Sequence, residues 1–138
     1  MGKSLPASAV LVIVLTIALG CGKSPPPDHL ADARKLLFDK NYDAARAACD
    51  RILTTSPDDY GAIILRGEIN YKVGDREAAL SDFSHAIARI PYKPDAYDWR
   101  CKIYLELADE SSGDEKDQYL ALAASDHRQL VLKDPSGP

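Results

Sequence analysis

The chain has little of what several large functional classes require. Its 17 Lys and Arg are outnumbered by 21 Asp and Glu, for a formal net charge of −4. No excess of positive charge is therefore available to bind a nucleic-acid backbone or an acidic membrane surface. Three cysteines in 138 residues are too few for a disulfide scaffold, and their spacing from the three histidines fits no zinc pattern.

Motifs for catalysis are missing as well. After the N-terminal segment no serine stands in a G-x-S-x-G turn, and Gly61, Gly67 and Gly74 are too far apart to form a phosphate-binding loop. The acidic pairs Asp58-Asp59 and Asp109-Glu110 fall at predicted turns, which favours solvated carboxylates over an acid–base pair or a calcium loop. We therefore predict no catalytic residue, no metal site and no cofactor, and an enzyme is the least favoured class.

The one long hydrophobic run lies at the N-terminus. Lys3 precedes an almost wholly apolar stretch, residues 5–19, and the small Gly20 then stands before Cys21. About 15 apolar residues are fewer than the roughly 20 that a membrane-spanning helix needs. A positive start, an apolar run and a small residue, in that order, are typical of a secretory signal. Residues 1–20 are therefore predicted to be a signal peptide.

The cysteine directly after this segment resembles the lipobox cysteine of bacterial lipoproteins. In that family the signal is cut before the cysteine, the thiol is diacylated and the new N-terminus is acylated. The resemblance implies a lipid on Cys21 and a chain anchored to a bacterial cell membrane, with its domain in the periplasm or on the cell surface. Ala18 stands where the family most often has Leu. A short anchor helix and plain secretion remain as alternatives. Residues 21–28 form a proline-rich linker that reaches roughly 20 Å.

An internal repeat of 34 residues fills most of the remaining chain. Pro57 and Pro91 show this offset. It also relates Asn41 to Asp75, Asp43 to Glu77, Ala44-Ala45 to Ala78-Ala79, Cys49 to Phe83, Ala62 to Ala96, Arg66 to Arg100 and Ile69 to Ile103. Apolar residues recur at helical spacing, breaker residues separate these segments, and no alternation typical of a strand follows the signal. A 34-residue period of helix pairs predicts a stacked repeat protein.

The second copy resembles the tetratricopeptide repeat (TPR) consensus. Gly67 stands where the two helices of a repeat approach each other, Gly74-Asp75 is the turn between them, and Pro91 ends the repeat. The resemblance implies that Ala79 and Phe83, with Ala86, are packing residues of the second helix. It implies an all-α fold of three stacked helix-turn-helix repeats, a short right-handed α-solenoid. The domain would span 29–135, with copies at about 26–59, 60–93 and 94–135, before a tail at 136–138.

The outer copies depart from the consensus. The first copy lacks the turn glycine at Lys40. In the third copy the turn Gly113-Asp114 comes five residues late and Pro135 comes ten residues late. We therefore expect each helix of the third copy to be about five residues longer. Cys49 and Cys101 occupy packing positions in repeats that do not touch, so no disulfide between them is expected.

The resemblance also implies a concave groove lined by the first helix of each copy. Matching positions are Leu30, Arg34, Leu37, Phe38, Ile64, Leu65, Glu68, Tyr71, Lys72, Asp95, Asp98, Trp99, Lys102 and Leu105. The predicted partner-binding residues are Arg34, Phe38, Ile64, Glu68, Tyr71, Lys72, Asp98, Trp99 and Lys102. Leu65 and Trp99 are as well explained as inter-repeat core. Aromatic residues mixed with charge suit a peptide partner. Some members of the family bind the C-terminal carboxylate of chaperone tails with a clamp of polar groove residues. That clamp is not expected here, because Arg34 is the only residue at its positions that could contribute.

These patterns predict a membrane-tethered adaptor that binds a protein or peptide at the bacterial cell envelope, with a role in the assembly of an envelope complex. The alternative is a structural lipoprotein that forms homo-oligomers, a homodimer above all, through its last helix. That helix carries more apolar surface than one neighbour should cover, namely Tyr119, Leu120, Leu122, Ala123, Leu130, Val131 and Leu132.

Overall fold

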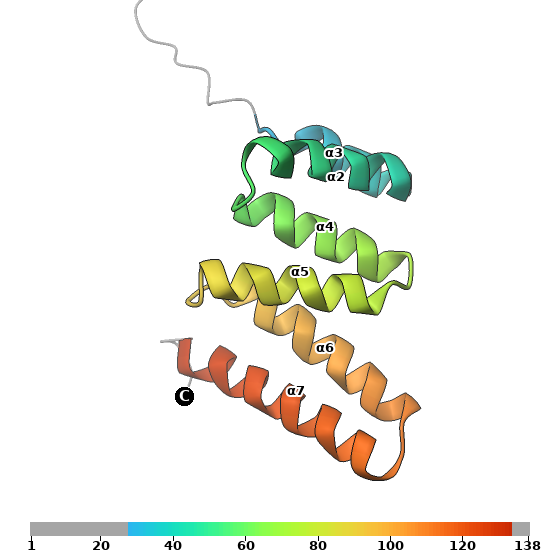
Figure 1. Ribbon diagram of the computed structural model, residues 1–138, viewed down its shortest axis with the longest axis vertical. Coiled ribbons are helices and arrows are strands. Elements are labelled where there is room, and N and C mark those ends of the chain that lie inside the picture. The colour runs from blue at the N-terminus through green and yellow to red at the C-terminus, as the bar shows by residue number, and fades with distance from the viewer. Residues whose placement is uncertain (1–27, 134–138) are drawn as a thin grey trace, which may run out of the picture.

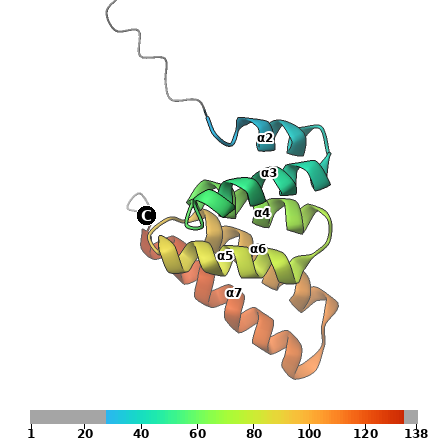
Figure 2. The ribbon, with the colours of Figure 1, turned by 45° about the horizontal axis from the view of Figure 1, so that its top comes forward.

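The structure, a computed structural model, describes residues 28–133, and these contain six α-helices and no strand. The helices are α2 (Ala31–Phe38), α3 (Tyr42–Thr55), α4 (Tyr60–Lys72), α5 (Arg76–Arg89), α6 (Asp95–Glu110) and α7 (Gly113–Lys133). They follow one another as a stack of antiparallel pairs (Figures 1 and 2). The predicted all-α fold of three TPR-type helix pairs is confirmed. The predicted signal peptide, Cys21, most of the linker and the tail lie outside the described residues.

The helix starts repeat with the same 34-residue period. Asn41 and Asp75, one period apart, each precede a second helix, and their side chains accept hydrogen bonds from the N–H groups of Ala44 and Ala78. Asp59 caps α4 in the same manner, through the Ala62 N–H at 2.8 Å. Such caps satisfy backbone donors that have no partner within the first turn of a helix.

The turns between the paired helices use the left-handed backbone region. Lys40 and Gly74, in the turns of the first two copies, have φ values of 58° and 87°, and Gly113, which begins α7 after the turn of the third copy, has a φ of 59°. Only glycine adopts this conformation without a steric cost from Cβ. The first copy therefore keeps the turn of the second at Lys40, but with a residue that strains it.

The two helices of the second copy meet at Gly67. A Cβ added there would lie 2.7 Å from Cε1 of Phe83, so no side chain fits without moving the ring. Ala79, Phe83 and Ala86 are fully buried, as the sequence predicts. They form one core cluster with residues of α4 and α6, and a second cluster joins α2, α3 and α4. The core thus runs continuously between neighbouring helix pairs, which is how stacked repeats bury their apolar faces.

Two expectations need correction. The third copy is longer, but unequally: α6 has 16 residues against 13 in α4, and α7 has 21 against 14 in α5. The extra turns thus lie mostly in the last helix. Leu30, a candidate groove position, is instead buried in the first core cluster. Its side chain lies over Gly61, because α2 starts only at Ala31 and leaves Leu30 in the cap.

A periodic arginine ties the helices together. Arg66 Nη2 donates to Asp82 Oδ1 at 2.6 Å within its own repeat, and its Nη1 donates to Asp50 of the preceding repeat at 2.8 Å. One period later, Arg100 contacts Asp126 and the Ser84 hydroxyl in the same two directions. Each arginine therefore links three helices. The sequence repeat included this pair of arginines but not their carboxylate partners.

Candidate functional site

Two adjoining pockets lie along the first helices of the first two copies. Each has a cavity volume of about 350 Å³, and both are lined by Arg34 of α2 and Glu68 of α4. Because they share these two residues, they form one continuous surface, which we call the first-helix groove. It lies where the TPR resemblance places a binding surface.

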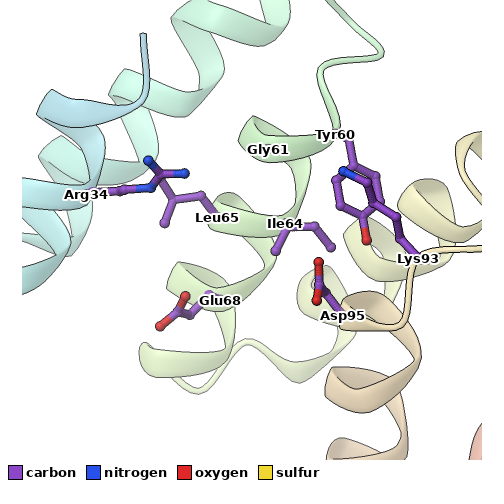
Figure 3. Close-up of a pocket in the computed structure, with 8 residues that line it drawn as sticks. All are labelled: Arg34, Tyr60, Gly61, Ile64, Leu65, Glu68, Lys93 and Asp95. Atoms are coloured by element: carbon purple, nitrogen blue, oxygen red, sulfur yellow. The ribbon is translucent and has the colours of Figure 1, made fainter. Parts of the chain in front are cut away.

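The first pocket of the groove sits at the junction of all three copies (Figure 3). Ile64 and Leu65 of α4 form its floor, with Arg34 on one side and Lys93 and Asp95 on the other. Lys93 Nζ lies 4.3 Å from the centre of the Tyr60 ring, a cation–π contact. Burial, helped by the nearby Asp95 carboxylate, raises the pKa of Tyr60 to about 12, so its hydroxyl stays neutral.

The second pocket of the groove lies between α2, the start of α3 and the end of α4. It is lined by Arg34, Leu37, Phe38, Lys40, Tyr42, Glu68 and Lys72. Phe38 is 86% exposed, the most exposed large apolar side chain in the described part of the chain. A phenyl ring left in water beside a pocket is an anchor available to a partner, since its burial on binding removes a large apolar area from solvent.

A third group, the aromatic cluster, joins α4 to α6. The rings of Tyr71 and Trp99 are 5.3 Å apart, and Lys102 Nζ lies 4.7 Å and 5.2 Å from their centres. The Tyr71 hydroxyl donates to Glu106 at 2.6 Å. Trp99 also stacks on the buried Phe83 ring at 5.7 Å. Trp99 is therefore both part of the inter-repeat packing and half-exposed beside the groove helices.

The predicted site residues fall into three places. Arg34, Phe38, Ile64, Glu68 and Lys72 line the groove pockets. Tyr71, Trp99 and Lys102 gather in the aromatic cluster, and Asp98 is exposed on α6 and lines neither pocket. Sequence reasoning missed the lining residues Tyr60, Lys93, Lys40 and Tyr42. They stand at or beside the junctions between helices, and the sequence marked only one of them, Lys40, as a turn position.

Positive charge in the groove is left unpaired. Lys40, Lys72 and Lys93 form no ion pair with any residue between 28 and 133, whereas Arg34 pairs with Asp28 at 2.5 Å. Glu68 lies among them at the boundary of the two pockets. The groove thus offers three unpaired lysines to a ligand, together with Arg34 and the carboxylates of Glu68 and Asp95.

Other candidate chemistry is weaker. In the described part, no group of three or more His, Cys, Asp or Glu is placed to hold a metal ion. His29 contacts Asp59 at 2.7 Å, and His85 lies 3.6 Å from Asp58. Cys49 and Cys101 are free thiols, and burial raises the pKa of Cys49 to about 11, which makes it a poor nucleophile. Among the helices described, none is long and apolar enough to cross a membrane.

Comparison with known proteins supports the fold. Residues 37–100 match the family described as tetratricopeptide repeat. A crystal structure of a thermophilic TPR protein of Thermus thermophilus is similar, with a TM-score of 0.69 and 24% sequence identity. The match covers 80% of this chain and 57% of that one, so this chain spans little more than half of its structural relative. No curated protein sequence matches the chain.

Proposed function

We propose that this chain is a membrane-anchored TPR adaptor that binds a protein or peptide partner along the first-helix groove. The TPR fold is one of protein–protein interaction. The observation that carries the proposal is the groove itself, in which two adjoining pockets combine an exposed phenyl ring with unpaired lysines. The absence of a metal cluster and of an activated thiol in the described residues offers no support for a catalytic role.

The groove favours an extended peptide with apolar and acidic side chains. Its two pockets are shallow and adjoin each other, so a chain can place successive side chains into both. Phe38 supplies an apolar anchor point, while Lys72 and Lys40 beside it attract carboxylates. Charged groups at the rim of an interface mainly accelerate association and set its salt dependence, and the apolar anchor supplies most of the affinity.

The experiment that tests the groove is site-specific photo-cross-linking in cells of the source organism. A photoreactive amino acid replaces Phe38 in one variant and Ala47 in another. Ala47 is exposed on α3 and lines neither pocket, so it serves as the matched control. We expect a discrete cross-linked product from position 38 and none from position 47. Products from position 47 alone, or from neither position, would place the partner surface elsewhere.

The membrane anchor is a separate part of the proposal. It is supported by the sequence pattern at Gly20-Cys21 and by the resemblance of that pattern to the bacterial lipobox. A lipid on Cys21 would hold the groove close to a bacterial membrane, outside the cytoplasm, where an adaptor can serve the assembly of an envelope complex. Cys21→Ser removes the thiol that carries the acyl chains. The variant should leave the membrane fraction. A variant that is still processed at Gly20 and still fractionates with membranes would overturn the lipoprotein interpretation.

A further inference from the structure

The outer face of α7 has no neighbour among the described residues. α7 packs against α6 alone, through residues that include Tyr119, Ala123 and Asp126. In Figure 1 it lies at one end of the stack with no helix beyond it. Eight large apolar side chains are exposed in the described part, and four belong to this one helix: Leu120, Leu122, Val131 and Leu132. The apolar surface of the stack is therefore concentrated at this end.

One strip of α7 points away from α6. Asp117, Ala121, Ala124 and Arg128 follow one another at spacings of four, three and four residues, which places them on one side of a helix. All four are exposed, whereas the buried Ala123 and Asp126 lie on the opposite side. Leu120 and Val131 border the strip along one edge. We call Asp117, Ala121, Ala124 and Arg128 the outer strip.

Charge is distributed unevenly along this helix. Asp114, Glu115 and Asp117 outnumber Lys116 in its first turns, and Arg128 lies near its end, beyond the buried Asp126 that pairs with Arg100. Neither Asp117 nor Arg128 forms an ion pair or hydrogen bond within residues 28–133, although both are exposed on the same strip. The strip thus has a negative end, a positive end and two small residues between them.

We propose that the outer strip binds the outer strip of a second copy, with the two α7 helices antiparallel about a two-fold axis. An axis midway between residues 122 and 123 brings Asp117 of each copy opposite Arg128 of the other. The same axis brings Ala121 opposite Ala124, and these small side chains let the helix axes approach closely. Leu120 and Val131 then pack along the edge of the interface. A two-fold arrangement uses one patch twice, so both ion pairs form at once.

The charges at the two ends of the outer strip favour the antiparallel orientation of two copies. A parallel pair would place acidic ends together and basic ends together, whereas the antiparallel pair joins opposite charges at both ends. The interface is small, because a helix of 21 residues is about 31 Å long. One helix pair buries less than the roughly 1,600 Å² of a standard interface, so we expect micromolar rather than nanomolar affinity. This pairing does not depend on the groove or its partner.

A charge-reversal set tests the pairing directly. The full chain is studied by sedimentation velocity in a density-matched detergent, from low to high micromolar concentration. Asp117→Arg places two arginines opposite each other, and Arg128→Asp places two aspartates opposite each other. Each single variant should weaken dimerisation at least about tenfold. An equal mixture of the two should restore a dimer, because every pairing then joins Arg to Asp.

Matched variants of exposed apolar residues distinguish this interface from non-specific hydrophobic association. Leu120→Glu on α7 should weaken the dimer, whereas Leu105→Glu on α6 should not, although the two leucines are similarly exposed at 41% and 46%. Circular dichroism melts establish that each variant is folded. A wild-type chain that stays monomeric at every concentration would overturn the proposal. So would a dimer that both single charge reversals leave intact, or a mixture that forms no heterodimer.

Discussion

Arg66 and Asp82 form a two-pronged ion pair that locks the helices of the second repeat together. Nη2 of the arginine donates to Oδ1 of the aspartate at 2.6 Å, and Nε donates to Oδ2 at 3.1 Å. The carboxylate is 7% exposed and also accepts from Asn70 at 3.0 Å. The partner hydrogen bond is the main reason that the pKa of Arg66 is raised, so the arginine stays charged at every working pH. The ion pair therefore joins α4 to α5 within the second repeat.

Removal of this carboxylate should therefore be costly. Asp82→Ala leaves a half-buried guanidinium with Asp50 alone and leaves the Asn70 amide without its acceptor. We expect the free energy of unfolding to fall by roughly 3 kcal/mol. This is the low end of the range for a broken buried ion pair, because the Arg66 side chain remains partly exposed to solvent. Urea denaturation followed by circular dichroism measures it. Asp43→Ala is the control: this carboxylate is 94% exposed and pairs with Arg46 at 3.4 Å, so its loss should cost under about 1 kcal/mol.

The strained turn of the first copy can be relieved. Lys40 has a φ of 58°, so Lys40→Gly should stabilise the domain by about 0.5–1 kcal/mol, after the greater freedom of glycine in the unfolded chain is subtracted. The reverse change at the equivalent turn, Gly74→Ala, should destabilise it by about 1 kcal/mol, although a Cβ there would meet no atom. Thermal melts of both variants measure these effects. Equal effects of the same sign would show that the two turns are not equivalent.

Contact between Gly67 and Phe83 should make even a methyl group harmful. Gly67→Ala forces the buried ring to move while Trp99 stacks on its face, and we expect a loss of about 1–3 kcal/mol. Phe83→Leu removes the edge of the ring. In a Phe83→Leu background, Gly67→Ala should therefore cost less stability than it does in the wild-type chain. A double-mutant cycle by urea denaturation should show this coupling. Additive losses would mean that the ring is free to move aside.

Acid should weaken the start of α4. Partial burial acts to raise the pKa of Asp59, but hydrogen bonds from the Ala62 N–H and His29 outweigh it, so the pKa lies below its ordinary value of 3.8. A carboxyl with a depressed folded pKa contributes stability above its unfolded value and loses it as the pH falls through the folded value. Asp59→Asn keeps a capping oxygen without a charge. The Tm advantage of wild type over this variant should therefore be present near neutral pH and shrink below about pH 4. An advantage independent of pH would contradict this assignment.

Features that recur with the repeat could be predicted from the sequence. Gly67, Ala79 and Phe83 stand at positions that the TPR resemblance assigns to close packing between the two helices, and all three are buried. The unequal lengthening of α6 and α7 could not be predicted, because a late turn and a late proline do not fix where each helix begins and ends, and α7 already begins at Gly113. Asp126 shows the same limit: it pairs with Arg100 only because α7 is longer, which moves it out of the 34-residue register.

The site residues were predicted less completely, because several of them lie outside the regular helix positions of the repeat. Helix positions such as Arg34 and Glu68 follow from the repeat, but Tyr60 and Lys93 come from junctions whose backbone path is set by tertiary packing. Tyr71 shows a different limit. Its position on the first helix was correct, but its hydrogen bond to Glu106 depends on where α6 lies. A Tyr71→Ala variant would therefore disturb the helix contact as well as the surface, and Lys72 is the cleaner probe of the groove.

The most direct test of the central claim uses the partner that cross-links at position 38. Its affinity is measured for two variants of this chain, each with one matched charge reversal. Lys72→Glu changes the groove, while Arg51→Glu changes an exposed cation on α3 that lines neither pocket. Titration calorimetry with both folded variants should show at least about tenfold weaker binding for Lys72→Glu, a reduced salt dependence, and no change for Arg51→Glu. Equal affinity of both variants and wild type would contradict binding in the first-helix groove.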